Sequence, residues 1–374
     1  MNDKIIAGII AQFLPDCAFV SSERIPTGHI NFTFKVNVVH NDNEVAYLLQ
    51  KINPDVFKIP IELMENISGV TAFLRNKIVA DGGDPERETL SVIPTADGRN
   101  CYMDESNAAW RLYNFIENSY SPSAIESKEL FYDAGVAFGT FQNMLADYPA
   151  DSLHETIPDF HNTAKRFENL VIAVKEDAAG RAQSVQEEIK FAFDRKNDTS
   201  VLVDMIAAGE LPIRVTHNDT KLNNILFDCD TNKPLCITDL DTVMPGLSLY
   251  DFGDSIRFGA NTAAEDEQDY TKVALDIELY EAYARGYLSA AGNSLTQREV
   301  SLLPLSAKMM TFECGMRFLT DYLNGDIYFG IKYPMHNLVR CHTQFALVYD
   351  IEQKYEQMLA VTRKAYEEIC GRTF

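Results

Sequence analysis

One segment of the chain, residues 214–250, carries polar side chains at spacings that could support chemistry. They are, in order, His217, Asp219, Lys221, Asn224 and Asp239. After Asn224 the sequence reads ILFD, a polar turn and PLCITD, which predicts a β-hairpin that returns Asp239 to the side of Asn224. Phosphoryl transfer from ATP needs a carboxylate for the acceptor's proton, oxygen ligands for Mg²⁺ and a cation near the phosphates. This segment could supply all of them.

Each of these side chains suits one part of that reaction. Asp219 is the candidate catalytic base, and Lys221 is the candidate cation at the transferred phosphate. Asn224 and Asp239 are candidate Mg²⁺ ligands, because this small hard cation prefers oxygen donors.

Three residues nearby have supporting roles. His217 is expected to brace the loop from inside. Asp241 lies two residues after Asp239 on the same side of an extended strand. We expect a second metal ligand or a substrate contact there, with a solvated structural role as the alternative. Asp251 opens an Asp-Phe-Gly triplet, but a helix-like sequence follows it, so we expect a helix cap and loop brace rather than a metal ligand.

A phosphate-binding site also needs elements that position it, and the first third of the chain reads as β-sheet. Residues 31–39 alternate apolar and polar side chains, and residues 45–51 follow after a short polar loop, which predicts an antiparallel hairpin. Residues 18–25 and 110–118 are expected to be further strands. The apolar spacing changes to a helical period in residues 61–77.

This sheet is the expected nucleotide-binding region. Lys51, at the end of the hairpin, is expected to meet the α- and β-phosphates, held by Glu65 or, as an alternative, Glu62 of the following helix. The other candidate nucleotide contacts are the turn residues Gly28, His29 and Asn31, and the backbone near Phe115 and Ile116 for the adenine.

From about residue 127 the pattern is mostly helical. Helices are expected over residues 131–148, 162–174, 183–193 and 337–369. The capping-box sequence Thr296-Gln-Arg-Glu299 predicts the start of another long helix. The fold class is therefore α+β, with a β-rich N-terminal lobe over residues 1–116 and a larger helical catalytic lobe over residues 117–374.

Charge and composition limit the partners. The formal net charge is −22, which argues against nucleic acid or an anionic membrane surface as a partner. No apolar run approaches the roughly 20 residues that span a bilayer. The apolar spacing near the N-terminus favours an amphipathic helix over a leader peptide. Seven scattered cysteines, without a C-x-x-C motif, favour a reducing cytoplasmic location.

The pattern H-x-D-x-K-x-x-N resembles the catalytic loop of the kinase superfamily, and in particular its aminoglycoside phosphotransferase/choline kinase branch. That resemblance implies a protein-kinase-like fold of two lobes, ATP as co-substrate and Mg²⁺. The segments LLQKINPDVF, HNDTKLNNILFD, TDLDTVMPG and ECGMRFLTDYLNGDIYFG are similar to those of N-acetylhexosamine 1-kinases. The likeness extends over about residues 20–350.

Members of that family phosphorylate the anomeric hydroxyl of N-acetylglucosamine or N-acetylgalactosamine. By position, Arg317 and Tyr328 match residues that contact the sugar there. The alternatives are an ion pair from Arg317 to Glu313, four residues earlier, and a core position for Tyr328. Asp321 and Asp326 could bind hydroxyls or cap a helix.

Other functions stay open at the level of sequence. The acceptor could be choline, an amino alcohol or an aminoglycoside. The chain could bind nucleotide without catalysing transfer. A metal-dependent hydrolase could also be built on Asp239 and Asp241.

Overall fold

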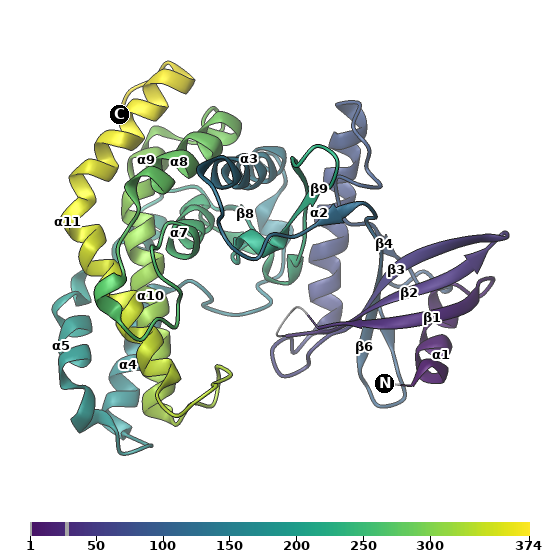
Figure 1. The fold of residues 1–374 in the computed structure, drawn as a ribbon, viewed down its shortest axis with the longest axis horizontal. Coiled ribbons are helices and arrows are strands. Elements are labelled where there is room, and N and C mark those ends of the chain that lie inside the picture. The colour runs from purple at the N-terminus through teal and green to yellow at the C-terminus, as the bar shows by residue number, and fades with distance from the viewer. Residues whose placement is uncertain (1, 27–29) are drawn as a thin grey trace. The chain divides into compact units, whose positions relative to one another are not determined.

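The computed structural model describes residues 2–26 and 30–374, which form two compact units (Figure 1). The first unit contains the described residues up to Ser121 and also Asp147–Pro158 and Ile225–Pro245. The second contains Pro122–Ala146, Asp159–Asn224 and Gly246–Phe374. The first unit therefore takes in two later segments, which a single boundary between residues 116 and 117 would assign to the second. Gly28 and His29 lie outside the described residues.

The first unit is built on an antiparallel sheet, as the alternating sequence predicts. Its strands are β1 (Ala18–Ile25), β2 (Phe32–His40), β3 (Asn43–Lys51), β4 (Val92–Ile93), β5 (Tyr102–Met103) and β6 (Ala109–Asn114). The order is β1-β2-β3-β6-β4, with β5 also paired to β6. Lys51, the last residue of β3, lies between Phe32 of β2 and Trp110 of β6.

Two helices accompany this sheet. The amphipathic α1 (Asp3–Phe13) buries Ile6, Ile9, Ile10 and Phe13 in a core with Val36 and Leu49 of the sheet. Helix α2 (Pro60–Ala80) begins with a proline, whose fixed φ and missing N–H suit the first helical turn. Both helices were expected from the apolar spacing.

A smaller sheet contains the predicted hairpin of the catalytic segment. Strands β9 (Ile225–Asp228) and β10 (Pro234–Ile237) are antiparallel, and β7 (Ser119–Tyr120) pairs with the other edge of β9. Ile225 is the partner of Ile237, so the two ends of the hairpin lie side by side. The strand predicted over residues 110–118 is too long. It ends at Asn114, and Asn118 has a left-handed backbone (φ 53°) that extended pairing does not allow.

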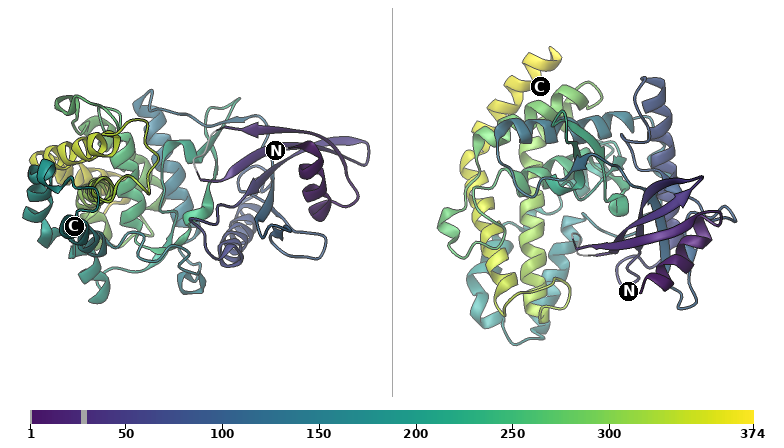
Figure 2. Two further views of the ribbon diagram at one scale, coloured as in Figure 1. Left: turned by 90° about the horizontal axis from the view of Figure 1, so that it is seen from below. Right: turned by 45° about the vertical axis from the view of Figure 1, so that its right-hand side comes forward.

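The second unit is mainly helical, and it completes the two-lobe protein-kinase-like fold (Figure 2). Its helices are α3 (Lys128–Met144), α4 (Thr163–Glu176), α5 (Gln186–Asp194), α6 (Val201–Ala207), α7 (Ser248–Gly259), α8 (Ile277–Ala291), α9 (Gln297–Ser301), α10 (Leu303–Asn324) and α11 (His336–Cys370). The short strand β8 (Arg214–Thr216) belongs to this unit, and the sequence boundary between the two units falls within β11 (Met244–Gly246). Helix α11 packs along α10. Among the described residues, no helix combines the length and the apolar character that crossing a bilayer requires.

The capping box at Thr296 is present, but the long helix predicted after it is divided in two. Helix α9 ends at Ser301, and α10 starts at Leu303 with Pro304 in its first turn. Proline lacks the N–H that would continue the hydrogen-bond ladder of α9, so a new helix starts there.

Helices α3 and α8 touch backbone to backbone through glycines. A Cβ on Gly286 would lie 2.0 Å from the carbonyl oxygen of Tyr132, which no side-chain rotation relieves. We expect Gly286→Ala to lower the free energy of unfolding by about 2–3 kcal/mol. Urea unfolding followed by far-ultraviolet circular dichroism measures it. Gly8→Ala in α1 is the matched control, because its Cβ meets nothing within 4 Å, and it should gain roughly 0.5–1 kcal/mol.

Candidate active site

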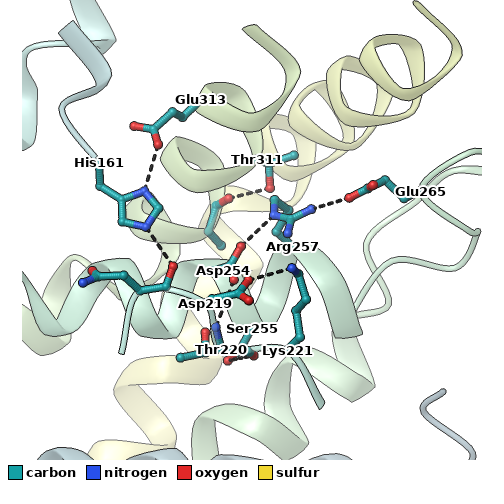
Figure 3. Close-up of polar contacts among 12 residues, drawn as sticks. His161, Asp219, Thr220, Lys221, Asp254, Ser255, Arg257, Glu265, Thr311 and Glu313 are labelled. Atoms are coloured by element: carbon teal, nitrogen blue, oxygen red, sulfur yellow. Dashed lines mark hydrogen bonds and ion pairs between the residues drawn. The ribbon is translucent and has the colours of Figure 1, made fainter. Parts of the chain in front are cut away.

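Asp219, Lys221 and Asn224 meet in one loop of the second unit. Figure 3 shows Asp219 beside Lys221. The ammonium of Lys221 lies 2.7 Å from Oδ1 of Asp219. The side-chain amide of Asn224 donates to the carbonyl oxygen of Asp219 at 2.8 Å and lies 3.3 Å from its Oδ2. Burial lowers the pKa of Lys221, but the charges of Asp219 and Asp254 outweigh it, so the pKa is raised and the side chain stays cationic. The side chain of Asp219 is 27% exposed and can reach a ligand.

Asp251, the first residue of the Asp-Phe-Gly triplet, braces this loop from the first turn of α7. Its carboxylate accepts hydrogen bonds from the backbone N–H groups of His217 (2.9 Å) and Asn218 (2.7 Å). The Thr220 hydroxyl donates to its carbonyl oxygen. Both carboxylate oxygens of Asp251 therefore accept hydrogen bonds from the backbone of the loop. Burial raises the pKa of Asp251 to about 6, against a smaller lowering by His217.

The raised pKa of Asp251 predicts a pH-dependent stability. The folded protein keeps a proton that the unfolded chain releases near pH 3.8, so the stabilisation from Asp251 declines as pH rises through 6. Between pH 5.5 and 8 this loss amounts to about 1 kcal/mol. The measurement is the difference in free energy of unfolding between wild type and Asp251→Asn at the two pH values. A difference that is constant with pH would contradict the raised pKa.

Three further residues stabilise this loop: His217, as expected, and Asp254 with its partner Arg257, which the sequence did not indicate. The buried ring of His217 lies edge-on to Phe138 and Phe141, and its Nδ1 accepts the N–H of Asp219 at 3.3 Å. Asp254 accepts the N–H of Thr220 (3.1 Å) and the Nε–H of Arg257 (2.8 Å). Asp254 follows Asp251 by three residues in a helix, so the sequence spacing could have predicted that both carboxylates lie on the same helix face.

Asp239 and Asp241 belong to the first unit and have different environments. Asp239 has a left-handed backbone (φ 57°, ψ 54°), a conformation that costs about 1 kcal/mol or more in a non-glycine residue. Asp241 is 2% exposed, and both its oxygens are used inside the protein. One accepts from Arg111 in a buried ion pair, and the other accepts from the side chain of Asn31 at 2.5 Å.

Arg111 is the counterion that the sequence did not indicate as functional. It is 1% exposed in β6, and its Nε–H also donates to the side chain of Gln50 at 2.9 Å. Burial opposes the charged form, but the charge of Asp241 outweighs it and raises the pKa of Arg111. One sequence feature could have identified Arg111: it is an arginine in a predicted strand whose other residues are nearly all apolar. A charged side chain in such a strand requires a buried partner of opposite charge.

The expected nucleotide contacts lie along β3, β6 and α2. The ammonium of Lys51 lies 5.8 Å from the ring centre of Trp110. Glu65 does not meet it, because its Oε2 lies 2.8 Å from Nε2 of His154.

Phe115 and Ile116 follow directly after β6. The ring of Phe115 lies 4.1 Å from the Lys35 ammonium, and the carbonyl of Ile116 accepts from the hydroxyl of Ser119. Asn31 also accepts the backbone N–H of Asn53.

Arg317 and Tyr328 line a cavity of about 260 Å³ in the second unit. Its other lining residues are Arg166, Asn169, Thr320, Asp321, Asn324, Ile327 and Phe329. The guanidinium of Arg317 lies 5.4–5.9 Å from the ring centres of Phe160, Tyr328 and Phe329. Glu313 does not pair with it, since this carboxylate binds His161 and Thr163, and Tyr328 is 62% exposed and so outside the core.

Asp321 organises the loop that closes one side of this cavity. Its carboxylate accepts the backbone N–H groups of Ile327, Tyr328 and Phe329 at 2.8–3.0 Å. The side-chain amide of Asn337 donates to it as well, at 2.9 Å, and also to Asp326. The Asp321 carboxylate is therefore occupied by four donors.

The donor set for a metal ion fits Mg²⁺. Among the described residues, no three His, Cys, Asp or Glu side chains are arranged so that they could hold a metal ion by themselves. Asn224 uses its Nδ2 inside the loop, which makes its oxygen the atom suited to a metal. The carboxylate of Asp239, which belongs to the first unit, is likewise a hard oxygen donor of the kind that Mg²⁺ prefers.

Comparisons with known structures agree on the fold. The choline kinase of Cryptosporidium parvum Iowa II is 14% identical, with 96% of this chain and 98% of that chain covered and a TM-score of 0.59. Spectinomycin phosphotransferase in complex with ADP and spectinomycin is 11% identical, with 96% and 99% covered and a TM-score of 0.56. The GDP complex of aminoglycoside 2′-phosphotransferase-IIIa is 11% identical, with 92% and 99% covered and a TM-score of 0.58.

A family-level match covers the candidate catalytic residues. Residues 95–296, more than half of the chain, match the phosphotransferase enzyme family. The matched stretch contains the loop of Asp219 and Asn224, its brace Asp251, and the β9–β10 hairpin that leads to Asp239. On this match and the geometry of the loop, the chain belongs to the phosphotransferase enzyme family.

Proposed function

We propose that this protein is an ATP-dependent kinase that transfers the γ-phosphoryl group to the anomeric hydroxyl of an N-acetylhexosamine. The family match supports phosphoryl transfer, and two of the similar structures contain ADP or GDP. The sugar acceptor is supported by the resemblance of the segment around Arg317 to N-acetylhexosamine 1-kinases. It is also supported by the charge of the cavity in the second unit.

Asp219 would hold the acceptor hydroxyl and take its proton. Its ion pair with Lys221 and its contact with Asn224 limit the rotation of the carboxylate. A carboxylate placed in this way can orient the hydroxyl oxygen for in-line attack and accept the proton as the new P–O bond forms. Lys221 would then offset negative charge on the transferred group.

Asn224 and Asp239 would hold Mg²⁺ through their side-chain oxygens. When bound, Mg²⁺ would neutralise charge on the phosphates and fix their orientation. Lys51 is suited to the α- and β-phosphates, because its ammonium has no ion-pair partner among the described residues. Asp241 is the weaker candidate for the metal, since Arg111 and Asn31 already use its oxygens. The same contacts remove the support for a hydrolase built on Asp239 and Asp241.

The single observation that carries the acceptor class is the charge of the cavity. Two guanidinium groups, Arg166 and Arg317, line it. The carboxylate of Asp321 is occupied by backbone and amide donors. The faces of the nearby aromatic rings, which could otherwise hold a quaternary ammonium, already face the Arg317 cation. With two guanidinium groups against one carboxylate, the lining carries a net positive charge, which disfavours choline, amino alcohols and polycationic aminoglycosides. Hydroxyl and acetamido oxygens would accept hydrogen bonds from Arg317.

The test is phosphorus NMR of the products formed from ATP and Mg²⁺ with N-acetylglucosamine, N-acetylgalactosamine, choline or an aminoglycoside. We expect a sugar 1-phosphate signal coupled to the anomeric proton, and no phosphocholine. Turnover of choline without turnover of either hexosamine would refute the sugar assignment. Nucleotide binding without transfer to any acceptor would favour a catalytically silent protein.

A further inference from the structure

The buried histidine His161 connects α10 to the catalytic loop within the second unit (Figure 3). Its Nδ1 lies 2.8 Å from Oε1 of Glu313, and its Nε2 lies 3.2 Å from the carbonyl oxygen of Asn218. Asn218 is the residue directly before Asp219. The ring of His161 packs between those of Phe160 (4.6 Å between centres) and Tyr250 (5.1 Å), and the residue is 9% exposed.

Both ring nitrogens of His161 face hydrogen-bond acceptors. A backbone carbonyl can only accept, and so can an ionised carboxylate. Glu313 is ionised, because burial raises its pKa but the charge and hydrogen bond of His161 outweigh burial and hold the pKa below its ordinary value. The hydroxyl of Thr163 donates to its second oxygen at 2.7 Å. A neutral imidazole beside an ionised Glu313 would leave one nitrogen lone pair facing an oxygen, so with Glu313 ionised this geometry favours the imidazolium.

The carbonyl that His161 contacts belongs to the peptide unit that leads into Asp219. The N–H of this same unit donates to Nδ1 of His217 at 3.3 Å. Two imidazole rings therefore hold the two ends of one peptide plane. Asn218 needs such support, because its left-handed backbone (φ 64°) costs about 1 kcal/mol or more in a non-glycine residue.

We propose that His161, held as an imidazolium by Glu313, is a positioning residue that fixes the Asn218–Asp219 peptide and so aims the Asp219 carboxylate. Loss of its Nε2 proton would set a lone pair against the carbonyl oxygen, and the peptide would rotate. The charged and titratable groups near His161 come from α10 and α7, and they are Glu313, Tyr250, Asp251 and Asp254. The charge of Arg317, also in α10, acts on Glu313. Glu313 is the one that is hydrogen-bonded to its ring.

The first arm of the test is nitrogen-15 NMR of the histidine rings in the full-length protein at pH 7. We expect both ring nitrogens of His161 to carry protons, with the signals assigned by their absence in His161→Gln. In Glu313→Gln the amide can donate to Nδ1, so His161 should lose one proton and become neutral. Wild-type His161 with an unprotonated ring nitrogen would overturn the proposal. This arm does not depend on enzymatic activity.

The second arm is kinetic and rests on the proposed kinase function. His161→Gln should lower kcat by about tenfold to a hundredfold while the KM for ATP is unchanged, because a small misplacement of a catalytic group reduces the rate of the chemical step. Glu313→Gln should lower kcat less, since a neutral His161 can still donate from Nε2. His342→Gln is the matched control, because His342 also pairs with a glutamate, Glu188, at 2.6 Å but has no hydrogen bond to the catalytic loop among the described residues.

The two arms separate the possible failures. If wild type phosphorylates no acceptor, the proposed function fails while the NMR result still decides the charge of His161. An unchanged kcat in folded His161→Gln would refute the positioning role. If His161→Gln does not fold, the signals that lose a proton in Glu313→Gln identify His161. In that case, a kcat for Glu313→Gln as low as that of Asp219→Asn would contradict the proposal.

Discussion

Asp219→Asn should lower kcat by about a thousandfold while the KM for ATP stays within about twofold, because the base is lost and the nucleotide contacts are kept. Asparagine has nearly the same shape as aspartate, so the contact with Asn224 can persist. It cannot accept a proton from the acceptor hydroxyl, however, and it no longer offsets the charge of Lys221. Steady-state assays with saturating acceptor separate kcat from the KM for ATP.

The matched control is Asp194→Asn. Asp194 also pairs with a lysine, Lys190, but on the exposed face of α5, where its side chain is 56% accessible. Its kcat should equal that of wild type, and both variants should keep the thermal midpoint of wild type within a few degrees. A kcat for Asp219→Asn within tenfold of wild type would refute the assignment of Asp219 as the catalytic base.

Asp241→Ala should lower the free energy of unfolding of the first unit by about 3–5 kcal/mol, because it leaves the buried cation of Arg111 without its partner. The loss of the hydrogen bond from Asn31 adds to the effect. Trp110, the single tryptophan of the chain, adjoins Arg111 in β6, so its fluorescence during urea unfolding reports on this unit.

A second substitution distinguishes a structural ion pair from a lost metal ligand. Asp241→Ala combined with Arg111→Met should recover most of the lost stability, since no buried charge is then left unpaired. Lys190→Ala, which breaks an exposed pair, should change stability by less than about 0.5 kcal/mol. If Asp241→Ala is as stable as wild type but loses its response to Mg²⁺, then Asp241 is a metal ligand rather than the counterion of Arg111.

The catalytic loop illustrates what local sequence can show. His217, Asp219, Lys221 and Asn224 lie within eight residues, so their mutual contacts depend on one loop and its backbone. The β9–β10 hairpin, the β2–β3 hairpin and helices α1, α2 and α11 were likewise predicted, because each has a periodic apolar pattern over its own length. Two elements were predicted too long: the strand after residue 110 ends at Asn114, before the left-handed Asn118, and the helix after Thr296 ends at Ser301, before Pro304.

The ion-pair partners of buried charged side chains could not be predicted from the local sequence. The distance along the chain from His161 to Glu313 is 152 residues, and from Arg111 to Asp241 it is 130. A charge buried in low dielectric must find a counterion, but the sequence does not say which of 55 acidic residues supplies it. Arg317 shows the same limit. Its spacing allowed an ion pair with Glu313, yet His161 takes that carboxylate and the guanidinium lies among aromatic rings instead.

The sequence by itself determined the candidate groups: a base, a cation and oxygen ligands at spacings that suit phosphoryl transfer. It also indicated an α+β fold with a kinase-like pattern. Only the tertiary structure decided which of the remaining acidic side chains are engaged in holding the protein together. Asp241 and Glu313 are such residues, whereas Asp251 was already expected to brace the loop. The physical reason is that hydrogen bonding along a loop depends on neighbours in sequence, whereas the pairing of a buried charge depends on which distant segments pack against it.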